Sequence, residues 1–386
     1  MSKILSIETI PVSIPYYHQE NSYQVNRDGV SDIVIKITTD DGVIGWGESC
    51  SGADVESVIK TIDALKNFVI GQNPFNKEYM YNLALHKGIW NFREGTFNFA
   101  WAGIDMALWD ICGKICKQPL YNLLGGLHRE KVNYFYYLPT GESEDVLIEE
   151  CNKGVESGYD VFYIKTGVDI KKDIEDIELI RKIIGNEKKI RIDSNQAWSV
   201  SEASKYLKIL NEFNIDFAEQ PVPAEPIENM LELKRKTQVP LCSNEGLWSI
   251  NDAWRIIKSR SCDVVCFSPY WVGSISNFYN ISLSANIENI KICKHTHGEL
   301  GIAAFAMQHL LLSLPNIVDG NQQTSSLLKD DIIACAFPIQ KEADWGAPTG
   351  HGLSIKIDEE KLRFYHQNYK KIGQYLPYDK NKVKVM

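Results

Sequence analysis

The stretches KIRIDSNQAW (residues 189–198) and NIDFAEQP (residues 214–221) decide the fold. Each begins with a short apolar run and then reaches an acid, Asp193 in the first stretch and Glu219 in the second. A helix-like run separates them, so they are typical of consecutive strand–helix units that aim side chains at one point. A third acid, Glu245, follows VPLCSN after a similar interval. Three strand-end acids at near-equal spacing indicate a hard-cation site rather than three helix caps.

The strand–helix pattern repeats along the middle of the chain. Eight strand-type runs alternate with amphipathic segments, at residues 132–138, 161–165, 189–193, 216–219, 239–243, 263–268, 291–295 and 316–319. Near-equal units that end in polar residues favour closure into a barrel over an open doubly wound sheet. We therefore expect an α/β fold, with a (β/α)8 TIM-type barrel domain at residues 128–337 that carries the metal site.

The flanking segments predict a second structural unit. Residues 1–127 combine alternating strands, an Asp-Gly hairpin turn in TDDGVIG and two long helical runs, which indicates an α+β N-terminal domain. Within it, residues 16–27 are polar and aromatic without periodicity, so they predict either a mobile surface loop or a substrate lid. Residues 338–386 are mixed, and GHGLSIKID (350–358) is expected to be a last strand that returns to the first domain.

Composition excludes several classes of protein. The 386 residues are 44% hydrophobic and 24% charged, with a net charge of −9, which argues against a nucleic-acid partner. No apolar run is long enough to predict a signal peptide or a membrane span. The nine cysteines form no CxxC pair and lie mostly in apolar runs, which favours buried, reduced thiols in a cytoplasmic protein.

In such a barrel the active site lies at the C-terminal ends of the strands, so the residues there are site candidates. In strand order the candidates are Lys165, Asp193, Asn195, Glu219, Asn244, Glu245, Ser268, His295, His297 and Asn321.

The residue types at these strand ends point to one kind of chemistry. Three acidic oxygen ligands, Asp193, Glu219 and Glu245, suit one Mg²⁺ ion per chain. A metal beside a carboxylate substrate lowers the energy of the enediolate that forms when the α-proton leaves. Lys165 can take that proton if burial and the nearby cation depress its pKa. His295 can act from the opposite side, as a second base or as the acid for a leaving hydroxyl.

The motifs resemble the enolase superfamily, specifically its mandelate racemase and muconate lactonizing enzyme branch, almost from end to end. The matching motifs are GVIGWGE (42–48), IDMALWDICGKICKQPLYNLLGG (104–126), RIDSNQAW, FAEQPVP, SNEGLWSINDA and HGELGIAAFAMQHLLLSLPN. The resemblance implies a capping domain over a modified barrel, bound Mg²⁺, removal of an α-proton from a small carboxylate substrate, and a 16–27 loop that closes over that substrate. By position, it implies that Asp193, Glu219 and Glu245 hold the metal. Asn244 stands where muconate-type members carry the ligand, so the third ligand is either Asn244 or Glu245, and the racemase-type match favours Glu245.

Departures from the family pattern bear on the reaction. The family usually carries Lys-x-Lys on the second strand, and this chain has Tyr163-Ile164-Lys165, so the usual base remains without the lysine that tunes it. Ser268 stands where a lysine or an aspartate is usual, and the eighth strand, which usually offers a glutamate, has Asp319, Gly320 and Asn321 here. Without its aspartate partner His295 is a weaker base, which favours a dehydratase over a two-base racemase.

The leading hypothesis is thus dehydration of a sugar acid or related hydroxy acid, a lyase reaction in which Lys165, His295 or Tyr163 acts on the substrate. The alternative is a racemase or epimerase of an α-substituted carboxylate such as an amino-acid or betaine derivative. A second alternative is a non-catalytic relative that binds a metal and a small acid. Tyr17, His18 and Trp271 join the predicted substrate-binding residues, because their rings could cage a quaternary ammonium group. Exposed first-domain helices predict a homo-oligomer.

Overall fold

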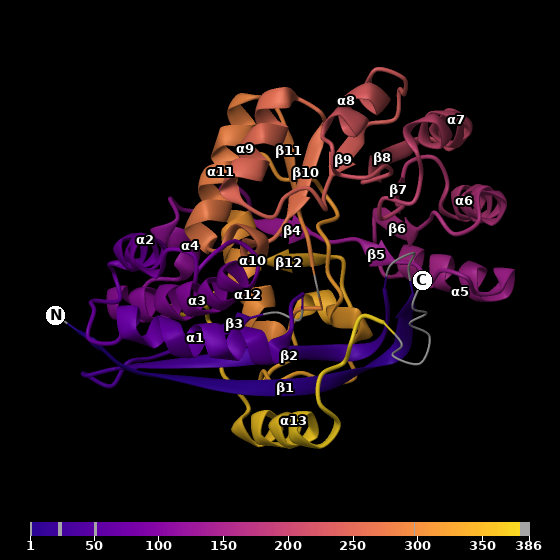
Figure 1. Ribbon diagram of the computed structural model, residues 1–386. Coiled ribbons are helices and arrows are strands. Elements are labelled where there is room, and N and C mark those ends of the chain that lie inside the picture. The colour runs from indigo at the N-terminus through magenta and orange to yellow at the C-terminus, as the bar shows by residue number, and fades with distance from the viewer. Residues whose placement is uncertain (1, 22–24, 50–51, 297, 379–386) are drawn as a thin grey trace.

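The computed structural model describes residues 2–21, 25–49, 52–296 and 298–378. A three-stranded antiparallel sheet with flanking helices lies below a curled parallel sheet, which carries its helices on the outside (Figure 1). This arrangement is a modified TIM-type barrel with a capping domain, as the sequence predicts.

The capping sheet consists of β1 (Ile4–Asn21), β2 (Asn26–Thr39) and β3 (Ile44–Ser49), in that order. Its helices are α1 (Val55–Val69), α2 (Lys77–Gly88) and α3 (Thr96–Cys116). Helix α3 crosses β3 so closely that a Cβ added at Gly47 would lie 2.0 Å from the carbonyl oxygen of Gly103. Gly45 and Gly47 of the GVIGWGE motif therefore permit the contact between helix and sheet.

Residues 16–21 and 26–27 of the predicted loop form strands, and residues 22–24 lie outside the described residues. A role of this segment as a substrate lid stays a prediction. The described residues there belong to the β1–β2 hairpin, with Glu20 opposite Arg27 after a register shift that follows Pro15. The Arg27 guanidinium pairs with Glu20 at 2.6 Å and lies over the Tyr16 ring. Aromatic and charged pairs across the two strands thus continue the ladder where the sequence shows no alternation.

Seven strands form the parallel sheet, in the order β11-β10-β9-β8-β7-β6-β5. They are β5 (Tyr136–Tyr137), β6 (Val161–Lys165), β7 (Lys189–Asp193), β8 (Ile215–Glu219), β9 (Leu241–Ser243), β10 (Val264–Phe267) and β11 (Lys291–Lys294). The helices around the sheet are α5 (Glu144–Glu156), α6 (Ile170–Ile184), α7 (Val200–Leu210), α8 (Glu228–Lys234), α9 (Ile250–Ser259), α11 (Ile275–Ile287) and α12 (Gly301–Leu312). Short elements join them: α4 (Leu120–Leu123), α10 (Pro269–Val272), η1 (Asn211–Phe213), η2 (Ser325–Leu327) and η3 (Pro338–Gln340).

Two of the eight predicted strands differ in the structure. The run at 132–138 is split into β5 and β4 (Lys131–Asn133), and β4 pairs antiparallel with β12 (Asp344–Gly346). The run at 316–319 forms no strand but a single bridge, Ile317 to Ile292, and Asn321 shortly after it forms another with Tyr134. These bridges span the gap between the two ends of the sheet. The eighth position is therefore filled by irregular chain.

The C-terminal residues lie against the capping sheet. The predicted strand at 350–358 is not formed. Instead α13 (Glu359–Ile372) packs on β1, where His366 Nδ1 lies 2.7 Å from the Pro11 carbonyl oxygen and Asn368 donates to that of Ser13 at 2.8 Å. In Figure 1 this helix lies below β1, on the face away from the barrel.

The described cysteines are free thiols, six of them buried and two, Cys116 and Cys335, exposed. Among the described residues, no helix combines the length and the apolar character that crossing a membrane requires.

Candidate active site

The register of the parallel sheet gathers the predicted chemistry at one edge. Lys165 at the end of β6 lies opposite Asp193 at the end of β7, and Asp193 lies opposite Glu219 at the end of β8. Lys165 Nζ is 2.6 Å from Asp193 Oδ2, and the Tyr163 hydroxyl donates to the same oxygen at 2.6 Å. Glu245 follows β9, the next strand in the sheet.

Asn195 connects the two outer acids of this group. Its side-chain nitrogen donates to Asp193 Oδ2 at 3.2 Å and to Glu245 Oε1 at 3.0 Å. Its side-chain oxygen accepts from Lys165 Nζ at 3.0 Å. Asn195 and Gln196 both have positive φ, 42° and 68°, a conformation that asparagine tolerates well and that turns the chain sharply after β7.

Glu219 is held by a residue that the sequence analysis missed. Gln322 Nε2 donates to both carboxylate oxygens of Glu219, at 2.9 and 2.8 Å. Gln322 follows Asn321 in the irregular eighth position of the barrel. The run Asn321-Gln322-Gln323 places three amide side chains near the predicted eighth strand end, but only Asn321 is predicted there as a site residue.

Burial is the largest influence on the pKa of two of the three acids, Glu219 and Glu245. It raises the pKa of Glu219 well above its usual value and that of Glu245 to about 7, and the charge of Asp193 adds to both effects. Burial lowers the pKa of Lys165, but the negative charges beside it, first that of Asp193, outweigh this and raise the pKa above its usual value. The expected depression of the Lys165 pKa is therefore not found in the pairing seen here.

These residues fit a divalent cation by the chemistry of their donors. Asp193 and Glu219 are buried, Glu245 is half-buried just after the next strand, and Glu245 Oε2 has no hydrogen-bond partner among the described residues. Hard oxygen donors with excess negative charge suit Mg²⁺. The three acids do not have oxygens within 4.8 Å of one another in the described part of the chain, since Lys165 and Asn195 lie against them. A cation bound there would replace some of these contacts.

His295 lies at the other end of the sheet, directly after β11. Its backbone nitrogen donates to the Phe267 carbonyl oxygen at 2.9 Å, and its ring lies 4.6 Å from that of Trp271. Trp271 in turn lies 4.6 Å from the ring of Trp248. Asn98 of α3 donates to the carbonyl oxygens of both tryptophans, so the capping domain positions this aromatic pair.

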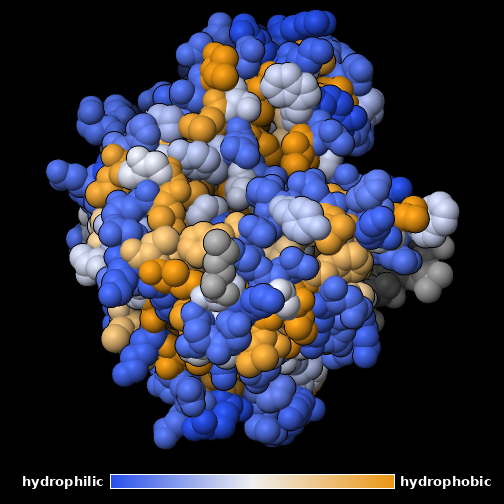
Figure 2. Space-filling model, turned by 90° about the vertical axis from the view of Figure 1, so that its left-hand side faces the viewer, coloured by the Kyte–Doolittle hydropathy of each residue, from blue (hydrophilic) through white to orange (hydrophobic). Residues whose placement is uncertain are grey.

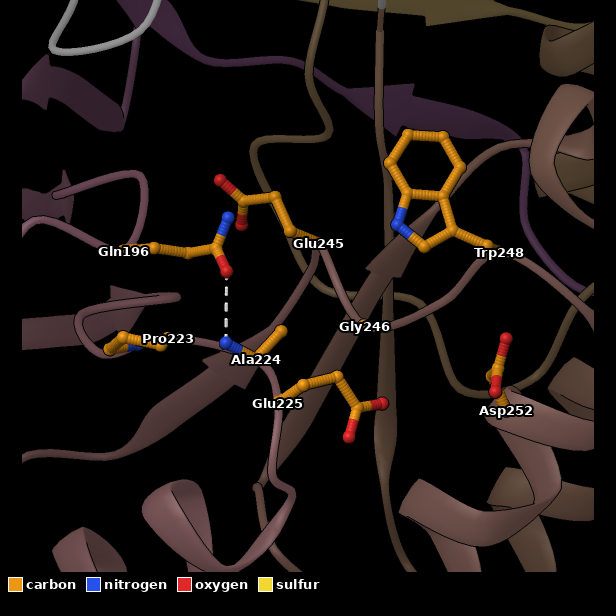
Figure 3. A pocket seen from close by; sticks show the side chains of 8 residues that line it. All are labelled: Gln196, Pro223, Ala224, Glu225, Glu245, Gly246, Trp248 and Asp252. Carbon is orange, nitrogen blue, oxygen red and sulfur yellow. Dashed lines mark hydrogen bonds between the residues drawn. The ribbon is translucent and has the colours of Figure 1, made fainter. Parts of the chain in front are cut away.

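A pocket of about 370 Å³ opens beside Glu245. Figure 3 shows the Glu245 carboxylate extending next to the Gln196 amide, whose oxygen accepts a hydrogen bond from the Ala224 nitrogen at 2.9 Å. Trp248 and Asp252 line the same hollow. Pockets of this volume accept small molecules.

Several predicted substrate-binding residues are used differently. Both polar atoms of the Asn321 side chain bond to backbone, accepting from the Lys294 nitrogen and donating to the Val318 carbonyl oxygen. The Asn244 amide nitrogen donates to the Cys266 carbonyl oxygen at 2.8 Å. Both side chains thus bond to the backbone at the strand ends. The buried Ser268 hydroxyl has no partner among the described residues.

The predicted aromatic cage is not assembled. Tyr17 is 61% exposed on the hairpin and His18 is exposed as well, whereas Trp271 is buried against His295 and Trp248. The structure thus does not bring Tyr17 and His18 to the buried group. His297 lies outside the described residues.

Two family models match the chain. "Enolase C-terminal domain-like" covers residues 146–361, and "Mandelate racemase / muconate lactonizing enzyme, N-terminal domain" covers residues 23–125. The N-succinyl-L-Arg/Lys racemase of Bacillus cereus is 32% identical over 372 residues, which are 94% of this chain and 97% of the racemase. The chain belongs to the mandelate racemase and muconate lactonizing enzyme family of the enolase superfamily.

Solved structures of family members support the fold. The crystal structure of the N-succinyl Arg/Lys racemase from Bacillus cereus has a TM-score of 0.86 at 28% identity, covering 94% of this chain and 98% of that one. A dipeptide epimerase from Enterococcus faecalis, complexed with Mg and the dipeptide L-Leu-L-Tyr, has a TM-score of 0.84 at 24% identity, covering 92% and 99%.

Members of the family catalyse different reactions. An arabinonate dehydratase from Saccharolobus solfataricus is 28% identical over 288 residues, 73% of this chain and 76% of the dehydratase. The chain is accordingly an enzyme of this superfamily, a lyase or an isomerase. The alternative of a non-catalytic binding protein is not retained.

Proposed function

We propose that the protein is a Mg²⁺-dependent racemase or epimerase of an α-substituted carboxylate, most closely an N-acylated amino acid or a dipeptide. This reverses the preference for dehydration drawn from the sequence. The names of the family members with high overall similarity, a racemase and an epimerase, support it. Their substrates carry an amide nitrogen at the α-carbon and no hydroxyl that must leave.

The observation that carries the proposal is the placement of Lys165 and His295. Four strands, β7 to β10, separate the strand of Lys165 from the strand that precedes His295. The predicted metal ligands lie on or after the strands in between. A substrate carboxylate held at those ligands would therefore have one basic group on each side of its α-carbon, which inversion of configuration requires.

The residues have distinct roles in this proposal. Asp193, Glu219 and Glu245 would hold Mg²⁺, whose charge, when bound, stabilises the negative charge that develops on the substrate carboxylate. Lys165 and His295 would exchange protons with the α-carbon from opposite faces. Tyr163 would position Asp193, because its buried hydroxyl donates to that carboxylate rather than facing the barrel mouth.

Dehydration of a hydroxy acid is the second candidate. The dehydratase relative supports it, and so does Ser268 at the position where a second lysine or an aspartate is usual. His295 would then act as the acid that protonates the leaving hydroxyl.

A substrate panel with Mg²⁺ separates the two candidates. Enantiopure N-succinyl amino acids, dipeptides and sugar acids are incubated in D₂O, and the products are analysed by NMR and chiral chromatography. The proposal expects both stereoisomers of an amino-acid derivative, with deuterium at the α-carbon. Conversion of a sugar acid to a 2-keto product, with no epimerisation elsewhere in the panel, would contradict it.

A further inference from the structure

Thiols gather in the barrel interior directly beneath the predicted metal ligands. Cys242, Cys266 and Cys293 come from the neighbouring strands β9, β10 and β11, and all three are buried. They form one cluster with Phe217 and Val264, which fills the barrel below the strand ends. Cys266 and Cys293 are register partners in the parallel sheet.

Glu219 joins two of these thiols in one group of donors. A carboxylate oxygen of Glu219 and the sulfurs of Cys242 and Cys266 all lie within 4.8 Å of one another. In a tetrahedral zinc site, bonds of about 2.3 Å to sulfur and about 2.0 Å to oxygen hold the donors about 3.5–3.8 Å apart, roughly 1 Å inside this limit. A small contraction of side chains would therefore enclose an ion.

The environment of the group is polar on one side. Gln322 Nε2 lies 3.2 Å from Cys266 Sγ while it also donates to both oxygens of Glu219. Gln322 thus contacts the carboxylate and one of the two thiols together. Thiolates bind Zn²⁺ and other soft cations in preference to Mg²⁺, so the donor set selects a different metal from the three acids above it.

We propose that Glu219, Cys242 and Cys266 form a second metal site, which takes a thiophilic divalent cation such as Zn²⁺ or Cd²⁺ and inhibits the enzyme. The two thiols release their protons to solvent as they bind the cation. Inhibition follows because Glu219 cannot serve both sites. The inhibition, but not the binding of the cation, rests on the proposed role of Glu219 in holding Mg²⁺.

Cadmium titration of the full chain tests the binding site without any turnover. We expect one Cd²⁺ per chain by equilibrium dialysis, together with the ultraviolet charge-transfer band of thiolate-bound cadmium. Cys242→Ser and Cys266→Ser should each weaken the affinity at least about tenfold and reduce the band. The matched control is the double variant Cys116→Ser/Cys335→Ser, which removes the two described exposed thiols and should retain both signals.

A measurement on the unaltered protein covers the case in which a serine variant does not fold. X-ray absorption of the zinc- or cadmium-loaded chain should show sulfur neighbours around the metal. A shell of oxygen and nitrogen alone would overturn the site. So would a charge-transfer band that is lost in the control variant and kept in Cys242→Ser and Cys266→Ser.

Competition with Mg²⁺ tests the shared ligand separately. The apparent Kd for Cd²⁺ should rise as the Mg²⁺ concentration is raised, and turnover on any identified substrate should fall as Cd²⁺ binds. Cadmium binding that Mg²⁺ does not affect would overturn the inhibitory role. Because the binding signals need no substrate, an enzyme inactive on amino-acid derivatives would count against the proposed reaction and leave the thiol site standing.

Discussion

At the scale of single residues, Asp193 is the centre of the candidate site. Its carboxylate accepts hydrogen bonds from Lys165, Tyr163 and Asn195 while it is 1% exposed. A buried carboxylate without such partners would be strongly destabilising. Tyr163 replaces the usual first lysine and supplies a hydrogen bond without a second positive charge. Lys165 is therefore the one described ammonium that contacts this carboxylate.

Gln322 is predicted to set the affinity for Mg²⁺. Gln322→Ala removes both hydrogen bonds to Glu219 and should weaken Mg²⁺ binding by about 10- to 100-fold, as loss of an orienting partner does at other metal sites. Isothermal titration of the metal-free chain with Mg²⁺ measures this directly.

Gln323 provides a matched control for that variant. It is also buried, but its side chain contacts the Phe135 carbonyl oxygen and Ser326 rather than an acid. Gln323→Ala should leave Mg²⁺ affinity near that of the wild type. Equal losses in the two variants would show that Gln322 acts through the packing of its segment.

At the scale of elements, Glu48 joins the capping sheet to the barrel. From the end of β3 it accepts hydrogen bonds from the Leu300 and Ala303 nitrogens, at the beginning of α12. Helix N-termini favour such a carboxylate. Burial is the larger influence, and together with the acids Asp331 and Glu299 it raises the pKa of Glu48 from 4.5 to about 8.

This shift predicts a pH dependence of stability. Because the pKa is raised on folding, the stabilising contribution is complete below pH 4.5 and is lost as the pH rises through about 8. Glu48 alone should lower the free energy of unfolding by up to about 1.4 kcal/mol per pH unit in that window. Glu48→Gln should reduce the slope measured by urea unfolding, and the exposed control Glu8→Gln should not. An unchanged slope in Glu48→Gln would contradict the assignment.

The crossing of α3 over β3 predicts a second stability effect. Gly47→Ala places a methyl group against the Gly103 carbonyl oxygen, so helix and sheet must separate. We expect a loss of about 1–3 kcal/mol in the free energy of unfolding, as for other overpacked sites. Gly346→Ala is the control, because its nearest neighbour would be 3.8 Å away. Equal stability of the two variants, measured by thermal or urea unfolding, would argue against a tight crossing.

The elements also show how far the sequence is informative. The strand ends at Asp193 and Glu219 were predictable because apolar runs of strand length precede an acid. The 16–27 hairpin was not, because cross-strand pairs such as Glu20 with Arg27 replace the apolar alternation. The sequence does not show that Gln322, rather than Asn321, contacts Glu219. The two amides are adjacent in an irregular segment, and such a segment has no periodicity from which the direction of a side chain could be predicted.

At the scale of the whole molecule, the capping domain completes the barrel mouth. Asn98 of α3 positions Trp248 and Trp271, and Glu48 of β3 meets α12, so both domains shape the surroundings of His295. Of the described cysteines, Cys116 and Cys335 are exposed and the other six are buried. Two of the buried thiols, Cys242 and Cys266, lie within 4.8 Å of a Glu219 carboxylate oxygen.

The homo-oligomer predicted from the sequence can be tested on one face. Figure 2 shows hydrophobic side chains across the middle of the face that carries α2 in Figure 1. Tyr79 of α2, and Ile89 and Trp90 directly after that helix, are exposed by 58%, 52% and 79%. Trp90→Glu should lower the mass found by light scattering, whereas Phe364→Glu on α13 should not. A monomeric wild type would contradict the prediction.

The central claim is that Lys165 and His295 act on opposite faces of one α-carbon. The most direct test follows α-hydrogen exchange in D₂O, with Mg²⁺ and each enantiomer of a substrate in turn, using Lys165→Ala and His295→Asn. We predict that neither variant racemises the substrate and that each still exchanges the α-hydrogen of one enantiomer, a different one in each variant. Exchange of the same enantiomer by both variants, or release of a 2-keto product, would contradict the account.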